Sequence, residues 1–391
     1  MLPLRASFSA HTVLAGLMVT LVGYASSVAI VIQGLAAVGA SQAQIASALV
    51  GLAIGKGLVG AGLSLWTRMP ISIAWTTPGM ALLATTGAMA GGFAEAVGAF
   101  IITGLLIVVA GTWETLGRWV AMIPKPIANA MLAGVILKLC LAPFVALSKL
   151  PLAAALVLVT WLVMMRLARL WAAPAAAVVA VLAMGFGGNG AGLPGFVWPT
   201  VEFVMPAFSL QALVSIALPL FLVTMASQNI PGYAVLGTYG YRPRMAPLLI
   251  STGAMSAATA VVGSPTINLA AITAALCAGP DAGPDPARRW SVAVVASLGY
   301  VACGLLAGVA VAIVTRSSPA LIEAAAGLAL IGALGGAMKG AIDEEPTRVA
   351  ALVTFLVSAS GLNVQGIGPA FWGLVIGLCV HGFLTIGRKA A

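Results

Sequence analysis

Long apolar stretches, separated by short clusters of Gly, Pro and charged residues, follow one another along the whole chain. A helix needs about 20 residues to cross the hydrocarbon core of a bilayer, and the polar clusters divide the sequence into fourteen stretches of roughly that length. Stretches three, seven, ten and thirteen are the weakest as complete spans. The pattern predicts an all-α polytopic membrane protein with spans at 12–37, 43–65, 71–91, 94–112, 124–145, 150–169, 173–187, 208–232, 245–262, 264–279, 289–315, 318–338, 346–361 and 367–387.

The composition supports a membrane protein and excludes several other classes. Of the 391 residues, 61% are hydrophobic and 7% are charged, and the mean hydropathy is +1.12. Soluble domains contain about 25% charged residues, so a soluble enzyme, a disordered chain and a nucleic-acid-binding domain are excluded. Fourteen spans leave room for short connections and for no large soluble domain.

The distribution of basic residues predicts the orientation of these spans. Loops on the cytoplasmic side of a membrane protein carry an excess of Lys and Arg. With both termini inside, fourteen of the eighteen basic residues fall in inner loops and tails. The predicted outer loops hold only Lys149 and Arg316, while Lys56 and Lys138 lie within spans. The net charge of +9 therefore has a topological explanation, with both termini on the cytoplasmic side of the membrane.

A weak internal repeat divides the chain into two halves. Four residues recur at a displacement of 193 positions, and the same displacement carries segment three onto segment ten. Seven spans per half is an odd number, so the second half would enter the membrane inverted, as in secondary transporters. We predict a first repeat at 1–188, a linker at 189–207 and a second repeat at 208–391. The recurring residues are Pro126, Ala133, Gly134 and Leu137, matched by Pro319, Ala326, Gly327 and Leu330.

Segments three and ten are interrupted, and matched interruptions indicate a substrate site near the midplane. In segment three, 70–75 reads as an extended stretch, with Thr77 as N-cap and Pro78 at the first helical position. In segment ten, 263–267 reads as extended and Asn268 as the N-cap. The helix from Pro78 to Ala90 would be about 20 Å long, too short for a core of about 30 Å. The N-termini of these two short helices would face each other and offer N–H groups and the positive ends of their dipoles to one carboxylate. Neither opening contains a fixed Lys or Arg, so the helix ends would hold the carboxylate without one.

Other readings of these residues remain open. The interruptions could be ordinary kinks that allow helices to pack, and polar side chains in segments one and eight could be hydrogen-bonding contacts between helices. Glu323 lies inside a span, where charged groups tend to be functional, although it is near Arg316 and could form an outer-end ion pair. His11 lies near a span end and could titrate near neutrality, so both residues are candidates for proton coupling. No pattern for a catalytic residue, a metal ligand or a cofactor is present.

Four motifs resemble the benzoate/proton symporter (BenE) family of bacterial inner membranes. They are Leu21-Val22-Gly23-Tyr24-Ala25-Ser26-Ser27, Ala74-Trp75-Thr76-Thr77-Pro78-Gly79, the run from Val223 through Ser227-Gln228-Asn229 to Gly232, and the run from Ile267 through Asn268 to Ala275. The resemblance covers essentially the whole chain, and the motifs in segments eight and ten are specific.

This resemblance implies a fold similar to that of uracil and anion transporters. A core domain would contain spans 1–4 and 8–11, and a gate domain spans 5–7 and 12–14. It also implies proton-coupled import of benzoate or a related aromatic carboxylate, with homodimers common in the wider superfamily. Uracil-type relatives carry carboxylates in segments eight and ten, where this chain has Ser227-Gln228-Asn229 and Asn268. That difference suits an anionic substrate and removes the obvious proton carrier.

We therefore expect an elevator-type importer that binds an aromatic carboxylate, protons and the lipid bilayer, and neither nucleic acid nor a cofactor. One alternative is a carrier or exchanger of another small anion or of a nucleobase. An anion channel and a membrane enzyme are further alternatives, but this sequence shows neither the ring of pore charges that a channel would use nor the catalytic groups that an enzyme would need. The predicted substrate-binding residues are Tyr24, Ser27, Trp75, Thr76, Thr77, Pro78, Gly79, Gln228, Asn229, Ile267, Asn268 and Leu269.

Overall fold

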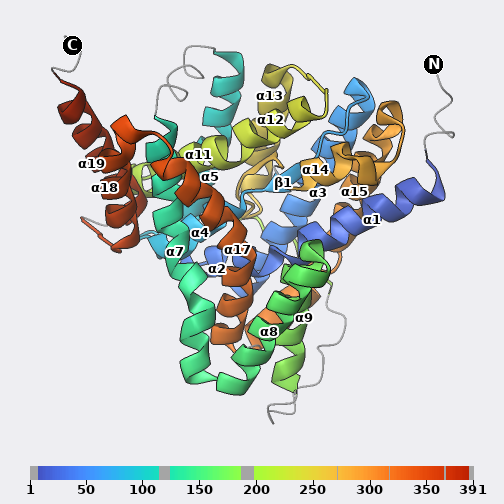
Figure 1. The fold of residues 1–391 in the computed structure, drawn as a ribbon, viewed down its shortest axis with the longest axis horizontal. Coiled ribbons are helices and arrows are strands. Elements are labelled where there is room, and N and C mark those ends of the chain that lie inside the picture. The colour runs from blue at the N-terminus through green and yellow to red at the C-terminus, as the bar shows by residue number, and fades with distance from the viewer. Residues whose placement is uncertain are drawn as a thin grey trace.

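Helices make up nearly all of the regular structure in the computed structural model, which describes residues 8–113, 124–185, 198–270, 272–316, 318–364 and 367–386. Figure 1 shows their arrangement around a short strand pair. The longer helices are α1 (Ala10–Ala25), α2 (Val28–Ala37), α3 (Gln42–Thr67), α4 (Thr77–Thr86), α5 (Phe93–Thr112), α7 (Lys125–Lys149), α8 (Pro151–Leu167), α9 (Ala172–Gly185), α11 (Leu218–Thr224), α12 (Ile230–Thr238), α13 (Met245–Ala260), α14 (Ile272–Ala278), α15 (Trp290–Gly304), α16 (Ala307–Arg316), α17 (Pro319–Ile342), α18 (Arg348–Ala359) and α19 (Pro369–Thr385).

Six helical stretches within the described ranges are long and apolar enough to cross a membrane, and a bent pair brings the number to seven. The bent pair lies in predicted span eleven, where Pro286–Gly304 meets Ala307–Val314 at 63°. Span one is one stretch, Ala10–Ala37, divided into α1 and α2 at Ser26 and Ser27. The chain is therefore a membrane-type helical protein, and several predicted spans are interrupted rather than continuous.

The strand pair joins the two predicted interrupted segments. Strands β1 (Ile73–Trp75) and β2 (Ile267–Leu269) run antiparallel, and Ala74 pairs with Asn268 at the centre. The two strands start 194 residues apart, within one residue of the displacement found in the sequence. Each strand is followed by a short helix, α4 after β1 and α14 after β2. Because the strands are antiparallel, these helices leave from opposite ends of the ladder.

Tight helix contacts surround this ladder. Helix α3 packs on α15, α1 also packs on α15, and α5 packs on α13. Gly104 of α5 and Gly253 of α13 make the last contact possible, because a Cβ on Gly104 would lie 2.8 Å from the Gly253 carbonyl oxygen. Small residues that allow close backbone approach are typical of helix pairs in membranes.

A second set of helices packs mainly within itself. Helix α7 contacts α17 and α18, α18 contacts α19, and α8 contacts α9, which also packs on α17 (Figure 1). Buried Ala, Val and Leu side chains of α7, α8, α9 and α17 form an apolar cluster of their own. These helices pack largely on one another, and α7, α17, α18 and α19 also contribute side chains to the main apolar core that contains the ladder.

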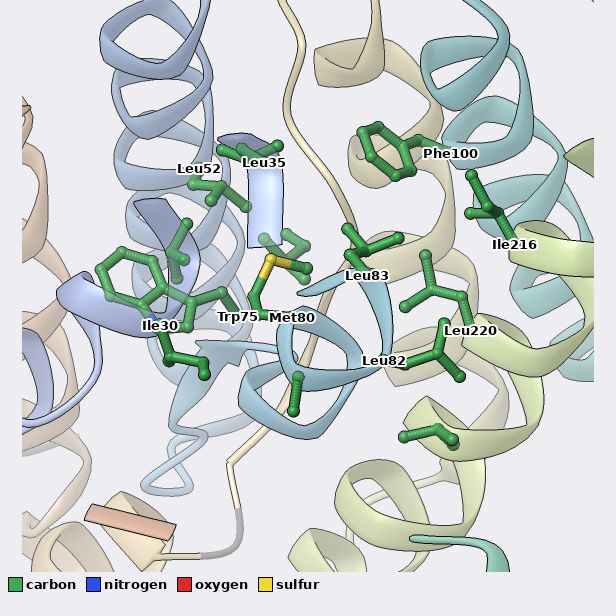
Figure 2. Close-up of a cluster of buried hydrophobic side chains, with 14 of the residues drawn as sticks. Ile30, Leu35, Leu52, Trp75, Met80, Leu82, Leu83, Phe100, Ile216 and Leu220 are labelled. Carbon is green, nitrogen blue, oxygen red and sulfur yellow. The ribbon is translucent and has the colours of Figure 1, made fainter. Parts of the chain in front are cut away.

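The short helix α4 lies in the main apolar core. Figure 2 shows its side chains between those of α2 and α3 on one side and those of α5 and α11 on the other. This packing holds a helix of ten residues, about 15 Å long, which is shorter than the predicted 20 Å. The labelled core residues are Ile30, Leu35, Leu52, Trp75, Met80, Leu82, Leu83, Phe100, Ile216 and Leu220.

The end of the predicted linker is fixed to the helices beside it. The amide of Glu202 donates to Ser47 Oγ at 2.9 Å, and the amide of Val204 donates to the Val261 carbonyl at 2.8 Å. The amide of Ala207 donates to the Ala94 carbonyl at 2.9 Å. Residues 189–197 of the predicted linker lie outside the described residues.

Candidate functional site: the strand ladder and its flanking helices

The start of α4 is determined by Thr76, one residue before the predicted cap. The Thr76 hydroxyl accepts from the Gly79 amide at 3.2 Å, and its carbonyl accepts from the Met80 amide at 2.9 Å. Thr77 is thus the first helical residue and Pro78 the second, so both predicted positions are shifted by one. The Thr76 amide is also occupied, since it donates to the Thr266 carbonyl at 3.3 Å.

The Thr77 amide is consequently the donor that this helix start leaves over in the part of the chain that the structure describes. The first amides of a helix have no intrahelical partner, and Pro78 has none to offer. Thr224 of α11 supports the cap from the other side, because its hydroxyl donates to Thr76 Oγ1 at 3.1 Å. This contact links span eight to segment three and was not predicted from the sequence.

The second interruption differs from its prediction. Asn268 is not a helix cap, because it lies at the centre of β2, and α14 begins at Ile272. The amide of Leu269 donates to Asn229 Oδ1 at 2.9 Å and the amide of Ala270 donates to the Ser72 carbonyl at 2.9 Å. These two amides are therefore occupied by protein acceptors and are not the free helix-start donors that were predicted to follow Asn268.

Asn268 offers an acceptor rather than a donor. Its Nδ2 donates to the Leu269 carbonyl at 2.7 Å, and its Oδ1 is buried with no partner in the described structure. A bare carboxylate is no partner for a carbonyl oxygen, so water, a hydroxyl or a protonated carboxyl group fits this atom. The side chain is completely buried.

The segment-eight motif Ser227-Gln228-Asn229 lies in a π-helical turn. Residues Met225–Asn229 adopt this geometry between α11 and α12, and such insertions are frequent at functional sites. Asn229 is completely buried and binds β2 through Leu269 as described. Gln228 is half-buried on the same turn. The Ser227 hydroxyl donates to the Val223 carbonyl of its own helix at 2.6 Å.

The two faces of the ladder separate the predicted residues. Successive strand residues point to opposite faces, so Trp75 and Ile267 share one face, whereas Asn268 shares the other with Ala74. The first face lies against α3, since Ile267 Cδ1 would be 3.8 Å from a Cβ added at Gly55. The structure therefore brings Asn268 and Trp75 to one ladder but not to one surface.

An aromatic group covers the α3 face. The Trp75 indole N–H donates to Ser27 Oγ at 2.9 Å, at the break between α1 and α2. The Tyr24 ring lies edge-on to Trp75 with centroids 5.7 Å apart, and the Tyr300 ring of α15 lies 6.5 Å from it. The Tyr24 hydroxyl is buried and has no partner among the described residues, so it is available to a ligand.

Lys56 completes this group, although the sequence suggested no fixed cation beside the interruptions. Its side chain is 2% exposed. The Nζ atom lies 3.9 Å from the Trp75 ring centroid and 3.2 Å from that of Tyr300. One signal could have found it: a lysine near the centre of a predicted span is costly and therefore tends to be functional.

The two residues predicted for proton coupling lie away from this ladder. His11 is exposed in the first turn of α1, and Glu323 is exposed in the second turn of α17. Neither side chain takes part in the hydrogen bonds or ion pairs described around β1 and β2. Their role in coupling stays a prediction.

Comparison with known proteins identifies the family. The model of the BenE family, described as benzoate membrane transport protein, matches residues 6–383. The chain belongs to the BenE family. It is 39% identical over 94% of its length to inner membrane protein YdcO of Escherichia coli, which it covers to 94%. It is 31% identical over 99% of its length to the benzoate membrane transport protein of Acinetobacter baylyi, which it covers to 98%.

Solved structures share the fold of this BenE-family chain. SLC26A9 matches over 96% of the chain with a TM-score of 0.63 and 13% identity, and the match spans 66% of that protein. The transmembrane domain of the cyanobacterial bicarbonate transporter BicA matches over 96% of the chain and 97% of its own length, with a TM-score of 0.57 and 16% identity. The chain is therefore a membrane transport protein rather than an enzyme, with the fold of these transporters.

Proposed function

We propose that this protein imports benzoate or a related aromatic carboxylate together with protons across the bacterial inner membrane. One observation carries the proposal. The site around the ladder offers hydroxyl, amide and ammonium donors beside aromatic rings, and no carboxylate faces it within the described ranges. A carboxylate in the site would repel an anionic substrate, whereas these donors bind one.

The proposed substrate-binding groups are the Tyr24 hydroxyl, the Thr77 amide and the Gln228 side chain, with Trp75 contacting the ring. The Tyr24 hydroxyl has no protein partner, and the other two lie at the start of α4 and on the π-helical turn. The positive end of the α4 dipole adds to the attraction for an anion. The names of the family and of the Acinetobacter relative support benzoate as the substrate.

We further propose fourteen spans in two inverted repeats, an elevator movement of a core domain against a gate domain, cytoplasmic termini and a homodimer. The 194-residue offset between β1 and β2 supports the repeat. The apolar cluster that α7, α8, α9 and α17 form among themselves supports a gate domain built on these helices. An inner-membrane location is supported by the name of the Escherichia coli relative.

Uptake of labelled benzoate into proteoliposomes tests this proposal. Wild type is expected to accumulate benzoate under an inward proton gradient, and unlabelled benzoate is expected to compete better than a nucleobase or a small inorganic anion. Tyr24→Phe and Gln228→Ala each remove a hydrogen bond to a charged group, and we expect about tenfold weaker apparent affinity. Gln42→Ala, an exposed change at the start of α3, is the matched control.

The possible failures separate the parts of the proposal. Absence of gradient-stimulated benzoate uptake by wild type rejects the activity. Stronger competition by a nucleobase or by an inorganic anion rejects the substrate class. Normal uptake by Tyr24→Phe and Gln228→Ala rejects only the assigned site.

A further inference from the structure

Lys56 is a buried amine without an anionic partner. It is residue 15 of the 26 in α3, which is long and apolar enough to cross the membrane, and its side chain is 2% exposed. A charged group in this environment is costly unless an opposite charge accompanies it. No Asp or Glu contacts it in the part of the chain that the structure describes.

The aromatic rings around Lys56 can stabilise a positive charge but carry no opposite charge. Its Nζ lies over the rings of Trp75 and Tyr300 at 3.9 and 3.2 Å from their centroids, and aromatic faces attract cations. The other titratable neighbour is Cys303 of α15, which interacts with it electrostatically. The Tyr24 ring of α1 contacts the same Trp75 ring, with centroids 5.7 Å apart.

The remaining elements packed on α3 contribute little further charge. Helices α2 and α13 and both strands of the ladder contain no titratable residue, and α16 has only Arg316, at its last position. When Lys56 is protonated, the balancing negative charge therefore has to come from outside the protein. If the proposed function is correct, the carboxylate of the substrate supplies it, held by the hydroxyl of Tyr24, whose ring contacts the same Trp75 ring as Lys56 Nζ.

We propose that Lys56 is the residue that binds the transported proton. This inference rests on the proposed function. Facing outward, the Lys56 amine takes a proton from water onto its nitrogen lone pair, and the resulting ammonium balances the charge of the incoming carboxylate. Facing inward, the carboxylate leaves, and the ammonium returns the proton to water as the free amine. One proton then accompanies each carboxylate, and neither the empty nor the loaded site carries net charge.

Lys56→Arg separates this role from a structural one. Arginine keeps the positive charge and the cation–π contacts but does not deprotonate in proteins. We expect the purified variant in proteoliposomes to exchange internal for external labelled benzoate at equal pH. We also expect it to lose stimulation by an inward proton gradient and to take up no proton when benzoate binds, measured with a pH-sensitive dye. Wild type is expected to take up about one proton per benzoate.

Further variants keep the test decisive. Lys56→Met, which cannot bind a proton, is also expected to lose gradient stimulation and proton uptake, and it replaces Lys56→Arg if that variant elutes as aggregate. Lys138→Met makes the same change at an exposed position of α7 and is expected to behave like wild type.

Three results would oppose the inference, and they are distinguishable. Wild-type gradient stimulation in either folded Lys56 variant overturns the role of Lys56 and leaves the substrate assignment intact. Benzoate exchange by wild type without any proton effect removes proton coupling altogether. If wild type neither binds nor exchanges benzoate, the proposed function fails, and the inference fails with it.

Discussion

Replacement of Asn229 by alanine tests whether the π-helical turn holds β2 in place. The Asn229 side chain is completely buried, and its Oδ1 accepts the Leu269 amide at 2.9 Å across 40 residues of sequence. Alanine removes this acceptor and leaves the N–H of Leu269, itself 1% exposed, without a partner. An unsatisfied buried donor costs about 1–3 kcal/mol, whereas an ordinary hydrogen bond contributes about 1 kcal/mol. We therefore expect a cost near the upper end of that range.

Thermal unfolding in detergent, followed by fluorescence-detected size exclusion, measures this effect. The matched control is Ser227→Ala on the same turn, because the Ser227 hydroxyl donates to the Val223 carbonyl of its own helix and such bonds contribute little to stability. Asn229→Ala is expected to lower the midpoint clearly and Ser227→Ala to leave it near that of wild type. Equal midpoints for the two variants would refute the reasoning, since the contact between the turn and the strand would then carry no measurable free energy.

Two further predictions concern packing and pH. Gly104→Val places side-chain atoms against the Gly253 carbonyl oxygen, which would lie only 2.8 Å from a Cβ at position 104. We therefore expect loss of monodisperse protein in size exclusion. A normal elution profile would contradict the α5–α13 contact. Tyr241 lies in the turn after α12, its hydroxyl donates to the Pro286 carbonyl at 2.7 Å, and burial raises its pKa despite the opposing effect of Arg289. Because folding favours the protonated phenol, the contribution of Tyr241 to stability is present below pH about 10 and is lost as pH rises through the raised pKa. Above that pH, the thermal midpoint should fall more steeply in wild type than in Tyr241→Phe. Parallel curves for the two proteins would contradict this prediction.

The position of the first interruption could be predicted closely, and that of the second less closely. Pro78 has no amide hydrogen, and a threonine before it favours a cap, so the sequence located the start of α4 to within one residue. Asn268 is a common cap residue, but it lies in a strand because the partner strand and Asn229 satisfy the backbone around it. Local preference was outweighed there by contacts from residues distant in the sequence.

The group around Lys56 could not be assembled from the sequence. Lys56 is visible as a charge inside a span, but its two aromatic neighbours come from β1 and from α15. The division of the predicted site between two ladder faces also depends on strand register, which three-residue strands do not reveal by periodicity. The sequence accordingly suggested a site without a fixed cation, whereas the structure places one behind Trp75.

The sequence by itself determined that this protein lies in a membrane, that it is helical and where its helices break. These features follow from hydropathy, Gly, Pro and capping residues, which act over a few neighbouring positions. The tertiary structure alone decided which broken segments pair, which amides remain free and which aromatic rings surround the buried lysine. Those features depend on contacts between residues that lie tens to hundreds of positions apart, and such contacts are selected by the packing of the whole molecule.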